Sequence, residues 1–481
     1  MRAPESQGQQ LRPAGLLEIF RHTFTRLGID SCVVVSAKYE SATGRPLDKP
    51  TLFTALEEVV NEHAELAARL CGDVVKSGPR SLTWIRLPSL DLAQIVEYRD
   101  ADSHDLQSIL EALFMQPFDL SADLPLWKLV ILSDNTVIFV YDHIMGDGQS
   151  GLGFHLSLLA ALKGVQEPCV HSGIITTLSH DVPLTLPLEE SMKISLPLCT
   201  LFHEVNQEMN PFSRRRRAAP WTGNRVPSAF KLGVNVWIMQ LSPMENSRLL
   251  QRCRAHGATL TGAIYALIAY VLARLLEARR QHARSFTIHI PVSLRPYSGA
   301  PPTAICNHVS FYEDVYEPIP PSPDSPSAYP SLSGFPWEHA ARFSDELRRA
   351  VPKSSAMVGL MQTLIGENPE SYLVGKLGQK RGATVLISNL GPIKRAPEPF
   401  RLGAEKTAPR SPPWSVQGMV FAQADATIGA PFKVNITGTP AGGLGIAVTS
   451  GKGSVDEAFA NECMAAFSEG LKELVAPGAL W

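Results

Sequence analysis

The stretch YDHIMGDG, residues 141–148, joins two segments of different character. It begins at the end of an apolar run, residues 137–141, which predicts a buried strand, and residues 149–162 after it have the apolar spacing of a helix. Functional side chains of α/β proteins gather where a strand ends and a helix begins. We therefore predict a functional site at this junction, centred on His143.

His143 has the chemistry of a general base. An imidazole has an unperturbed pKa of about 6.5, so near neutral pH much of it is free to take a proton from a hydroxyl or an amine. Gly146 and Gly148 let the backbone turn sharply and leave space for a substrate beside the ring. We predict that His143 is catalytic and that Gly148 lines the substrate site. An ordinary histidine at a strand end remains the alternative.

Asp147 admits two interpretations. As a catalytic partner it would hydrogen-bond His143, and as a structural residue it would cap the following helix or pair with an arginine. We favour the structural role, because the turn directs the two side chains apart. A metal site made of His143 and Asp147 is not expected, since no third ligand is apparent in the sequence.

Strand and helix patterns alternate in both halves of the chain. Residues 127–132 and 137–141 form a predicted hairpin around a Ser-Asp-Asn turn, and residues 259–279 form a long apolar helix. Hairpins together with crossovers predict a mixed-sheet α/β fold rather than a purely parallel one. The further predicted strands are 32–35, 82–87, 95–98, 234–238, 286–292, 384–387, 432–436 and 444–449.

The length of 481 residues exceeds what one hydrophobic core holds, since single cores stop growing near about 250–300 residues. We predict an N-terminal domain over 1–198, a crossover linker over 199–230 and a C-terminal domain over 231–481. The linker contains four consecutive arginines at 214–217. We interpret them as a solvated or cleft-facing loop, with phosphate binding as the alternative.

Composition excludes several classes of protein. Lys and Arg number 44 against 46 Asp and Glu, a net charge of −2, so no global field attracts nucleic acid or an anionic membrane. The 7 cysteines are scattered singly, which fits reduced thiols better than disulfides. The first residues lack the apolar core of a secretion signal, and the longest apolar run, 263–273, is shorter than the roughly 20 residues of a membrane helix. We expect a cytoplasmic monomer without a transmembrane segment.

Common catalytic and cofactor motifs are absent from the sequence. Residues 148–152 read GQSGL and lack the final glycine of a G-x-S-x-G nucleophile elbow. Residues 445–453 resemble a P-loop, but the glycine spacing is one residue too long and a glycine replaces the required Ser or Thr. No G-x-G-x-x-G after a strand, no H-E-x-x-H and no zinc-ligand spacing occurs. The sequence predicts chemistry without a bound cofactor or metal.

Five segments carry a family resemblance: PLWKLVIL (125–132), DHIMGDGQSG (142–151), TLTGAIYALIAYVLA (259–273), IPVSLRP (290–296) and LISNLGPI (386–393). In this order they resemble the CoA-dependent acyltransferase superfamily, and most closely the fungal alcohol O-acetyltransferases. This group is related to the plant BAHD enzymes and to the condensation domains of peptide synthetases. The BAHD signature D-F-G-W-G is missing, so the details of CoA binding in that branch are not carried over.

The resemblance implies two chloramphenicol-acetyltransferase-like domains, each a mixed sheet flanked by helices, with an active-site tunnel between them. Acyl-CoA would enter the tunnel from one face and the acceptor from the other. His143 would be the general base, and Asp147 would form a structural pair with Arg295 of the second domain. Ser388 and Asn389 match the Ser-Asn-x-Gly of the fungal group and would bind near the thioester or the developing oxyanion, a plain turn being the alternative.

The predicted function is direct transfer of an acyl group, with acetyl favoured, from acyl-CoA to the hydroxyl of a small apolar or natural-product alcohol. No acyl-enzyme is expected, because no Ser or Cys occupies a recognisable nucleophile position beside the base. Thr259 and Asn307 are further candidates for substrate contacts, although a helix cap and a strand end also explain them. The alternatives are ester or amide condensation from a carrier-protein thioester, and a repurposed scaffold without acyl transfer.

Overall fold

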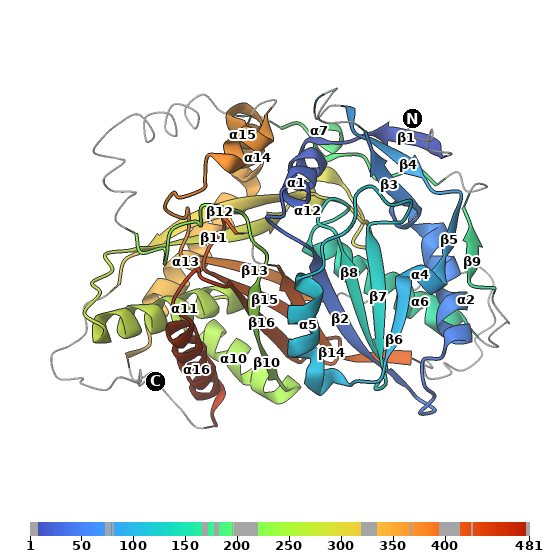
Figure 1. The fold of residues 1–481 in the computed structure, drawn as a ribbon. Coiled ribbons are helices and arrows are strands. Elements are labelled where there is room, and N and C mark those ends of the chain that lie inside the picture. Colours follow the sequence, from blue (N-terminus) through green and yellow to red (C-terminus); the bar gives the residue numbers. More distant parts are fainter. Residues whose placement is uncertain are drawn as a thin grey trace.

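The computed structural model has a mixed α/β architecture around two large sheets (Figure 1). It describes residues 8–72, 78, 81–165, 172–177, 182–194, 196, 220–318, 334–365, 368–393, 414–424 and 427–477. The arginine run at 214–217 and most of the predicted linker 199–230 lie outside these residues.

A five-stranded sheet dominates the first half of the chain, in the order β14-β2-β8-β7-β6. β6 and β7 are parallel, and the other neighbours are antiparallel. The central strand β8 is buried along its whole length, and it ends immediately before the His143 turn. The strands are β2 (Val33–Ser41), β6 (Val96–Arg99), β7 (Trp127–Leu132), β8 (Thr136–Tyr141) and β14 (Trp414–Gln423).

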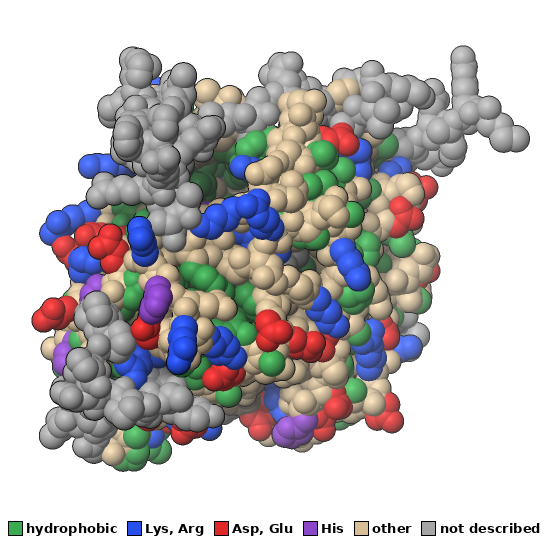
Figure 2. Space-filling model, turned by 60° about the vertical axis from the view of Figure 1, so that its left-hand side comes forward, with side chains coloured by type: hydrophobic (Ala, Val, Ile, Leu, Met, Phe, Trp, Pro, Cys, Tyr) green, Lys and Arg blue, Asp and Glu red, His purple; other side chains and the backbone are tan. Residues whose placement is uncertain are grey.

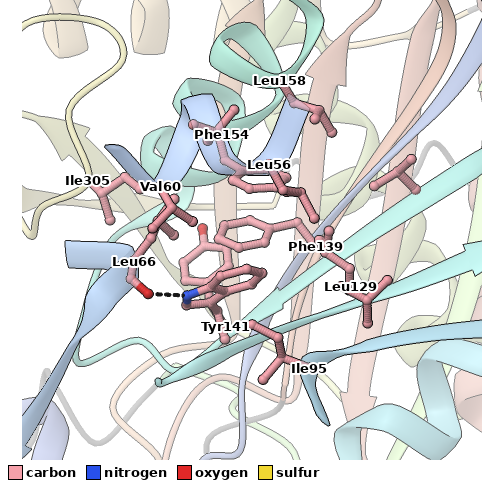
Figure 3. Close-up of a cluster of buried hydrophobic side chains, with 14 of the residues drawn as sticks. Leu56, Val60, Leu66, Ile95, Leu129, Phe139, Tyr141, Phe154, Leu158 and Ile305 are labelled. Carbon is pink, nitrogen blue, oxygen red and sulfur yellow. Dashed lines mark hydrogen bonds between the residues drawn. The ribbon is translucent and has the colours of Figure 1, made fainter. Parts of the chain in front are cut away.

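Both faces of this sheet pack in apolar cores, because alternate side chains of its strands enter two different cores. Phe139 packs beneath α2 and α6, where its ring stacks on Phe154 with centroids 3.9 Å apart (Figure 3). Ile138 points the other way, toward α5. The sheet is thus fixed from both sides, which holds the end of β8 in place. These helices are α2 (Lys49–Glu62), α5 (Leu106–Phe114) and α6 (Gly148–Gly164).

The second half forms a six-stranded sheet in the order β10-β16-β15-β13-β11-β12. β13 is parallel to both of its neighbours, and the remaining pairs are antiparallel. One face packs against α10, α11, α13 and α16 in a core of its own, and the other face is turned toward β14 and α5. The elements are β10 (Val234–Leu241), β11 (Phe286–Ser293), β12 (Val309–Tyr316), β13 (Val385–Pro392), β15 (Phe432–Gly438), β16 (Leu444–Gly451), α10 (Pro243–Ala255), α11 (Leu260–Ala278), α13 (Trp337–Ala350) and α16 (Glu457–Val475).

Strand β14 interlocks the two halves. It comes late in the sequence but pairs with β2 in the first sheet, as Figure 1 shows. Its backbone also passes close to the second sheet, where a Cβ on Gly445 would lie 2.0 Å from the carbonyl oxygen of Met419. Only glycine fits at that point. The predicted boundaries 1–198, 199–230 and 231–481 stay a prediction, and β14, from the last of these ranges, lies in the first sheet.

The predicted mixed-sheet α/β fold is confirmed, and the apolar helix predicted at 259–279 is α11. α11 is long and apolar enough to cross a membrane, but 67% of its apolar window is buried inside the structure, as in a core helix. Smaller elements complete the described part of the fold. They are β1 (Gln9–Pro13), β3 (Ala68–Cys71), β4 (Thr83–Arg86), β5 (Ser89–Asp91), β9 (Ile174–Thr176), α1 (Leu16–Arg26), α4 (Leu92–Ile95), α7 (Leu188–Ser191), α12 (Arg295–Ser298), α14 (Ser355–Ile365) and α15 (Pro369–Val374), with short 3-10 helices at Ala64–Ala67, Ser103–Asp105 and Val351–Lys353.

Candidate active site

The turn that carries His143 is shaped by Asp142. One carboxylate oxygen of Asp142 accepts the backbone N–H of Ile144 at 2.8 Å, and the other accepts the hydroxyl of Thr25, on α1, at 2.9 Å. Burial raises the pKa of Asp142 to about 7. The chain therefore leaves β8 in a tight turn, braced by α1, and the carbonyl of His143 meets Asn307 of the second half.

The imidazole of His143 is nearly buried, with 8% of the residue exposed. Its Nδ1 is buried without a hydrogen-bond partner among the described residues. Burial lowers the pKa of His143 well below its usual value of 6.5, and the positive charges of Arg21 and Lys433 lower it further. The ring is therefore neutral near pH 7, with a nitrogen lone pair able to accept a proton.

Asp147 is turned away from His143 and toward the second half of the chain. It is the N-cap of α6, and one of its carboxylate oxygens accepts two backbone N–H groups of the first helical turn. The guanidinium of Arg295 contacts both carboxylate oxygens, at 2.7 and 2.8 Å, and the N–H of His308 adds a further bond. Both oxygens are occupied, and no bond runs to the imidazole within the described residues.

Asp147 and Arg295 form a buried ion pair, with 6% of each side chain exposed. The structure thus brings together the two residues that the resemblance pairs. Arg295 also donates to the hydroxyl of Ser150 and to the carbonyls of Ala304 and Cys306, at 3.1–3.2 Å. Burial of charge is costly unless partners and hydrogen bonds compensate it, and both are present here. The pair fastens the start of α6 to the second half.

Asn307 and Thr259 hold backbone segments in place. The side-chain amide of Asn307 donates to the carbonyls of His143 and Ile144, both at 2.8 Å. Thr259 is the N-cap of α11, and its hydroxyl accepts the N–H of Gly262 at 3.1 Å. For both residues the structure therefore favours the backbone role over the predicted contact with a substrate.

Ser388 lies on the face of β13 that is turned toward the first half. Its neighbour Ile387 packs into the core around α11, and successive residues of a strand point to opposite faces. Ser388 is buried, and its hydroxyl makes no hydrogen bond within the described residues. Asn389, in contrast, donates to the hydroxyl of Thr261 at 3.0 Å and accepts the N–H of Gly391 at 2.8 Å. Ser388 is thus free to contact a substrate, whereas Asn389 shapes its own turn.

Gly148 is closely packed by two side chains of neighbouring strands. A Cβ at this position would lie 2.7 Å from Cδ2 of Leu390 and 2.9 Å from Cζ of Phe421. The start of α6 fits between the end of β13 and β14 because this residue has no side chain. Packing accounts for the glycine by itself, and its contact with a substrate stays a prediction.

Two cations beside the predicted base were not found from the sequence. Arg21 lies one helical turn before Thr25, on the face of α1 that is directed at the His143 turn. Lys433, on β15, is 5% exposed and donates to the carbonyl of Ala424 at 2.6 Å. Both lower the pKa of His143 through their charge. The segments meet only in the folded chain, so no local sequence pattern identifies them.

A cavity of about 410 Å³ opens between β14 and the second sheet. It is lined by Gln417–Met419 of β14, by the end of β10 and the start of α10, and by residues 439, 443 and 444, none of which is a predicted site residue. The tunnel through His143 that the resemblance implies stays a prediction. Within the described part of the chain, no group of three His, Cys, Asp or Glu side chains could hold a metal ion.

A sequence model of the alcohol acetyltransferase family matches residues 13–471. The chain belongs to the alcohol acetyltransferase family. Among curated members of this family, it is similar to the probable alcohol acetyltransferase crmB of Aspergillus fumigatus, with 25% identity over 392 residues and 77% of each chain covered.

Two solved structures share the fold of this acetyltransferase-family chain. The trichothecene 15-O-acetyltransferase TRI3 of Fusarium sporotrichioides superposes with a TM-score of 0.67 at 16% identity, over 99% of this chain and 96% of TRI3. The condensation domain of the Monacolin K polyketide synthase MokA gives a TM-score of 0.57 at 12% identity, over 98% of this chain and 99% of the MokA domain. The protein is thus a transferase with the two-lobed fold shared by these acetyltransferases and condensation domains.

Proposed function

We propose that this protein transfers an acetyl group from acetyl-CoA to the hydroxyl of a small apolar or natural-product alcohol, with His143 as the general base. One observation carries the proposal. At the end of β8 the structure has a buried imidazole whose Nδ1 is unpaired within the described residues, while the carboxylate four residues later is engaged by Arg295, and burial lowers the pKa of His143 below its usual value. Family membership supports the choice of donor and acceptor.

The reaction proceeds by direct attack. The acceptor hydroxyl donates its hydrogen bond to Nε2 of His143 and loses its proton to that nitrogen as its oxygen bonds to the thioester carbonyl carbon. The tetrahedral intermediate carries its negative charge on the former carbonyl oxygen. Its collapse breaks the carbon–sulfur bond, and the imidazolium returns its proton to the departing CoA thiolate. No covalent intermediate with the protein forms.

Ser388 is the candidate donor to the oxyanion. Its hydroxyl has no partner in the described residues and is directed toward the half of the chain that contains His143. A preorganised donor in a site that excludes water stabilises developing charge more strongly than water does. Asn389 is assigned to the turn that presents Ser388, because its own amide is already bonded.

The surface is consistent with small substrates as partners. Basic and acidic side chains of the described residues are interspersed over the face in Figure 2, and among these residues no large patch of one sign is seen that would attract a polyanion.

Thiol release tests the function. The purified protein is incubated with acetyl-CoA and a panel of apolar and natural-product alcohols, and free CoA thiol is followed against heat-unfolded protein as a control. The proposal expects release that depends on an alcohol and a matching acetyl ester. Turnover only with an acyl-pantetheine carrier protein would identify a condensation enzyme instead, and binding of alcohols without thiol release would identify a repurposed scaffold.

A further inference from the structure

A bulge near the end of β13 extends from the second half of the chain toward α6. The register of β13 with β15 shifts between Asn389 and Pro392. Two residues, Leu390 and Gly391, stand there opposite a single residue of β15. Gly391 has a φ of 74°, which glycine adopts readily, and its N–H donates to the side chain of Asn389 at 2.8 Å. Bulges redirect a strand and its side chains, and this one follows directly after the segment that contains Ser388.

Leu390, in the bulge, contacts the first half through both its side chain and its carbonyl. The side chain packs against the core of the first half. A Cβ on Gly148 would lie 2.7 Å from Cδ2 of Leu390, so the start of α6 lies directly against this side chain. The side-chain amide of Gln149 donates to the carbonyl of Leu390 at 2.9 Å. The bulge is thus docked on the first turn of α6 by one apolar contact and one hydrogen bond.

The hydrogen bond of Gln149 joins the two segments that carry the proposed reacting groups. Gln149 follows His143 by six residues, and Leu390 follows Ser388 by two. The backbone N–H of Gln149 is fixed by the carboxylate of Asp147 at 3.0 Å, and Ser388 lies in the regular part of the ladder with β15. Because both short segments are held in this way, a shift of the bulge along α6 would move Ser388 relative to His143.

The other polar contacts of the His143 turn reach a different part of the second half. Arg295 begins α12, after β11, and Asn307 precedes β12. Arg295 binds Asp147, and Asn307 binds the carbonyls of the turn. These bonds place the turn relative to β11 and β12, whereas the bond of Gln149 places β13 relative to α6. The two sets of contacts therefore control different distances across the site.

We propose that Gln149 is a positioning residue: its amide holds the bulge of β13 against α6 and so sets where the hydroxyl of Ser388 lies relative to His143. The proposal deepens the proposed function and rests on it for the roles of Ser388 and His143. The docking of the bulge can be measured without catalysis, so its failure is distinguishable from a failure of the proposed function.

Gln149→Met is the test variant, because it removes the amide donor and keeps a side chain of similar length. Asn246→Leu is the matched control. Asn246 is buried on α10, and its amide donates to a backbone carbonyl in another turn, that of Gly442 at 2.8 Å. Both of its partners lie in the second half, so the control removes a comparable hydrogen bond without altering the contact between β13 and α6.

Hydrogen exchange of the full-length protein without substrates is the first readout, since it reports local opening. The backbone amides of residues 386–391 should exchange up to about 10-fold faster in Gln149→Met, as expected for the loss of one hydrogen bond, and at the natural rate in Asn246→Leu. Gln149→Ala replaces the methionine variant if that variant fails to fold. Unchanged exchange of this segment, or equal acceleration along the whole chain, would overturn the proposal.

Turnover gives the second readout. Gln149→Met should lower kcat by about 10-fold, while KM for acetyl-CoA stays within about twofold, and Asn246→Leu should keep the natural kcat. In a Ser388→Ala background the same substitution should cost less than about twofold, because the donor that it positions is already absent. A full loss in that background would overturn the proposal. A natural protein without any acyl transfer would remove the proposed function, and hydrogen exchange would still decide whether Gln149 docks the bulge.

Discussion

The two sheets place their polar residues differently. In the first sheet both faces pack mainly in apolar cores, with small hydroxyl residues such as Ser36 and Thr136 among their buried polar side chains, and the polar residue of interest, His143, comes after the end of β8. In the second sheet one face is apolar, whereas the face directed at the first half carries buried polar side chains within its strands, such as Ser388 and Lys433. The first half thus offers a buried imidazole on a turn, and the second half offers buried polar side chains on the face that is turned toward the first half.

This difference predicts different outcomes for mutations. Changes at the turn should alter proton transfer. Changes on the polar face of the second sheet should alter stabilisation of charge. Changes at the contacts between the halves should alter stability first and catalysis only through it.

The largest effect on stability is expected at the ion pair between the halves. Asp147→Asn leaves the guanidinium of Arg295 buried without its countercharge, which should lower the free energy of unfolding by about 3–5 kcal/mol in denaturant titrations. A double-mutant cycle with Arg295→Met should give a coupling of about 0.5–3 kcal/mol. The control is Asp345→Asn, in an exposed cluster with Arg348 and Arg349. It should change the free energy of unfolding by less than about 1 kcal/mol. Equal losses at both sites would refute the special role of the pair.

Ser388→Ala should separate charge stabilisation from folding. Loss of a donor to the oxyanion is expected to lower kcat by about 10²-fold with little change in the melting temperature. Ser450→Ala, on β16, removes another buried hydroxyl, one that is bonded to Ser454. The control should leave kcat unchanged. If Ser388→Ala retains full turnover, the polar face of the second sheet does not contact the transition state.

The pH dependence should be weak near neutrality. Because the pKa of His143 is lowered, the neutral base persists as the pH falls through 6.5, and kcat/KM should stay level there and decrease only at lower pH. An unperturbed histidine would lose half of its activity at about pH 6.5. Asp142, with a pKa of about 7, is the other group that titrates in this range, and Asp142→Asn identifies any contribution from it. A half-loss at pH 6.5 that persists in Asp142→Asn would contradict the burial of the imidazole.

Local sequence patterns were sufficient to predict helices and strands such as α11 and to locate part of the candidate site. The periodicity of residues 259–279 predicted α11, and the junction at 141–148 located His143 and the structural orientation of Asp147. The partner Arg295 came from family resemblance, because nothing near it in the sequence indicates a carboxylate about 150 residues away.

The remaining features depend on contacts between distant segments. Strand β14 follows a proline-rich stretch and takes its place beside β2, which no local pattern specifies. Asn307 was a candidate for a substrate contact, with a strand-end role as the alternative, and its amide donates to the carbonyls of the turn. Arg21 and Lys433 approach His143 only in the folded chain. Which polar atom remains unpaired is a property of the packed structure.

The most direct measurement is a single turnover with both substrates saturating, in which CoA release is followed after rapid mixing. His143→Ala should slow this step by about 10²–10⁴ while the Kd for acetyl-CoA stays as in the natural protein. His63→Gln, which alters a buried histidine bonded to Ser157, should retain the natural rate. A rate for His143→Ala within a few-fold of the natural protein would show that the proton is taken by another group.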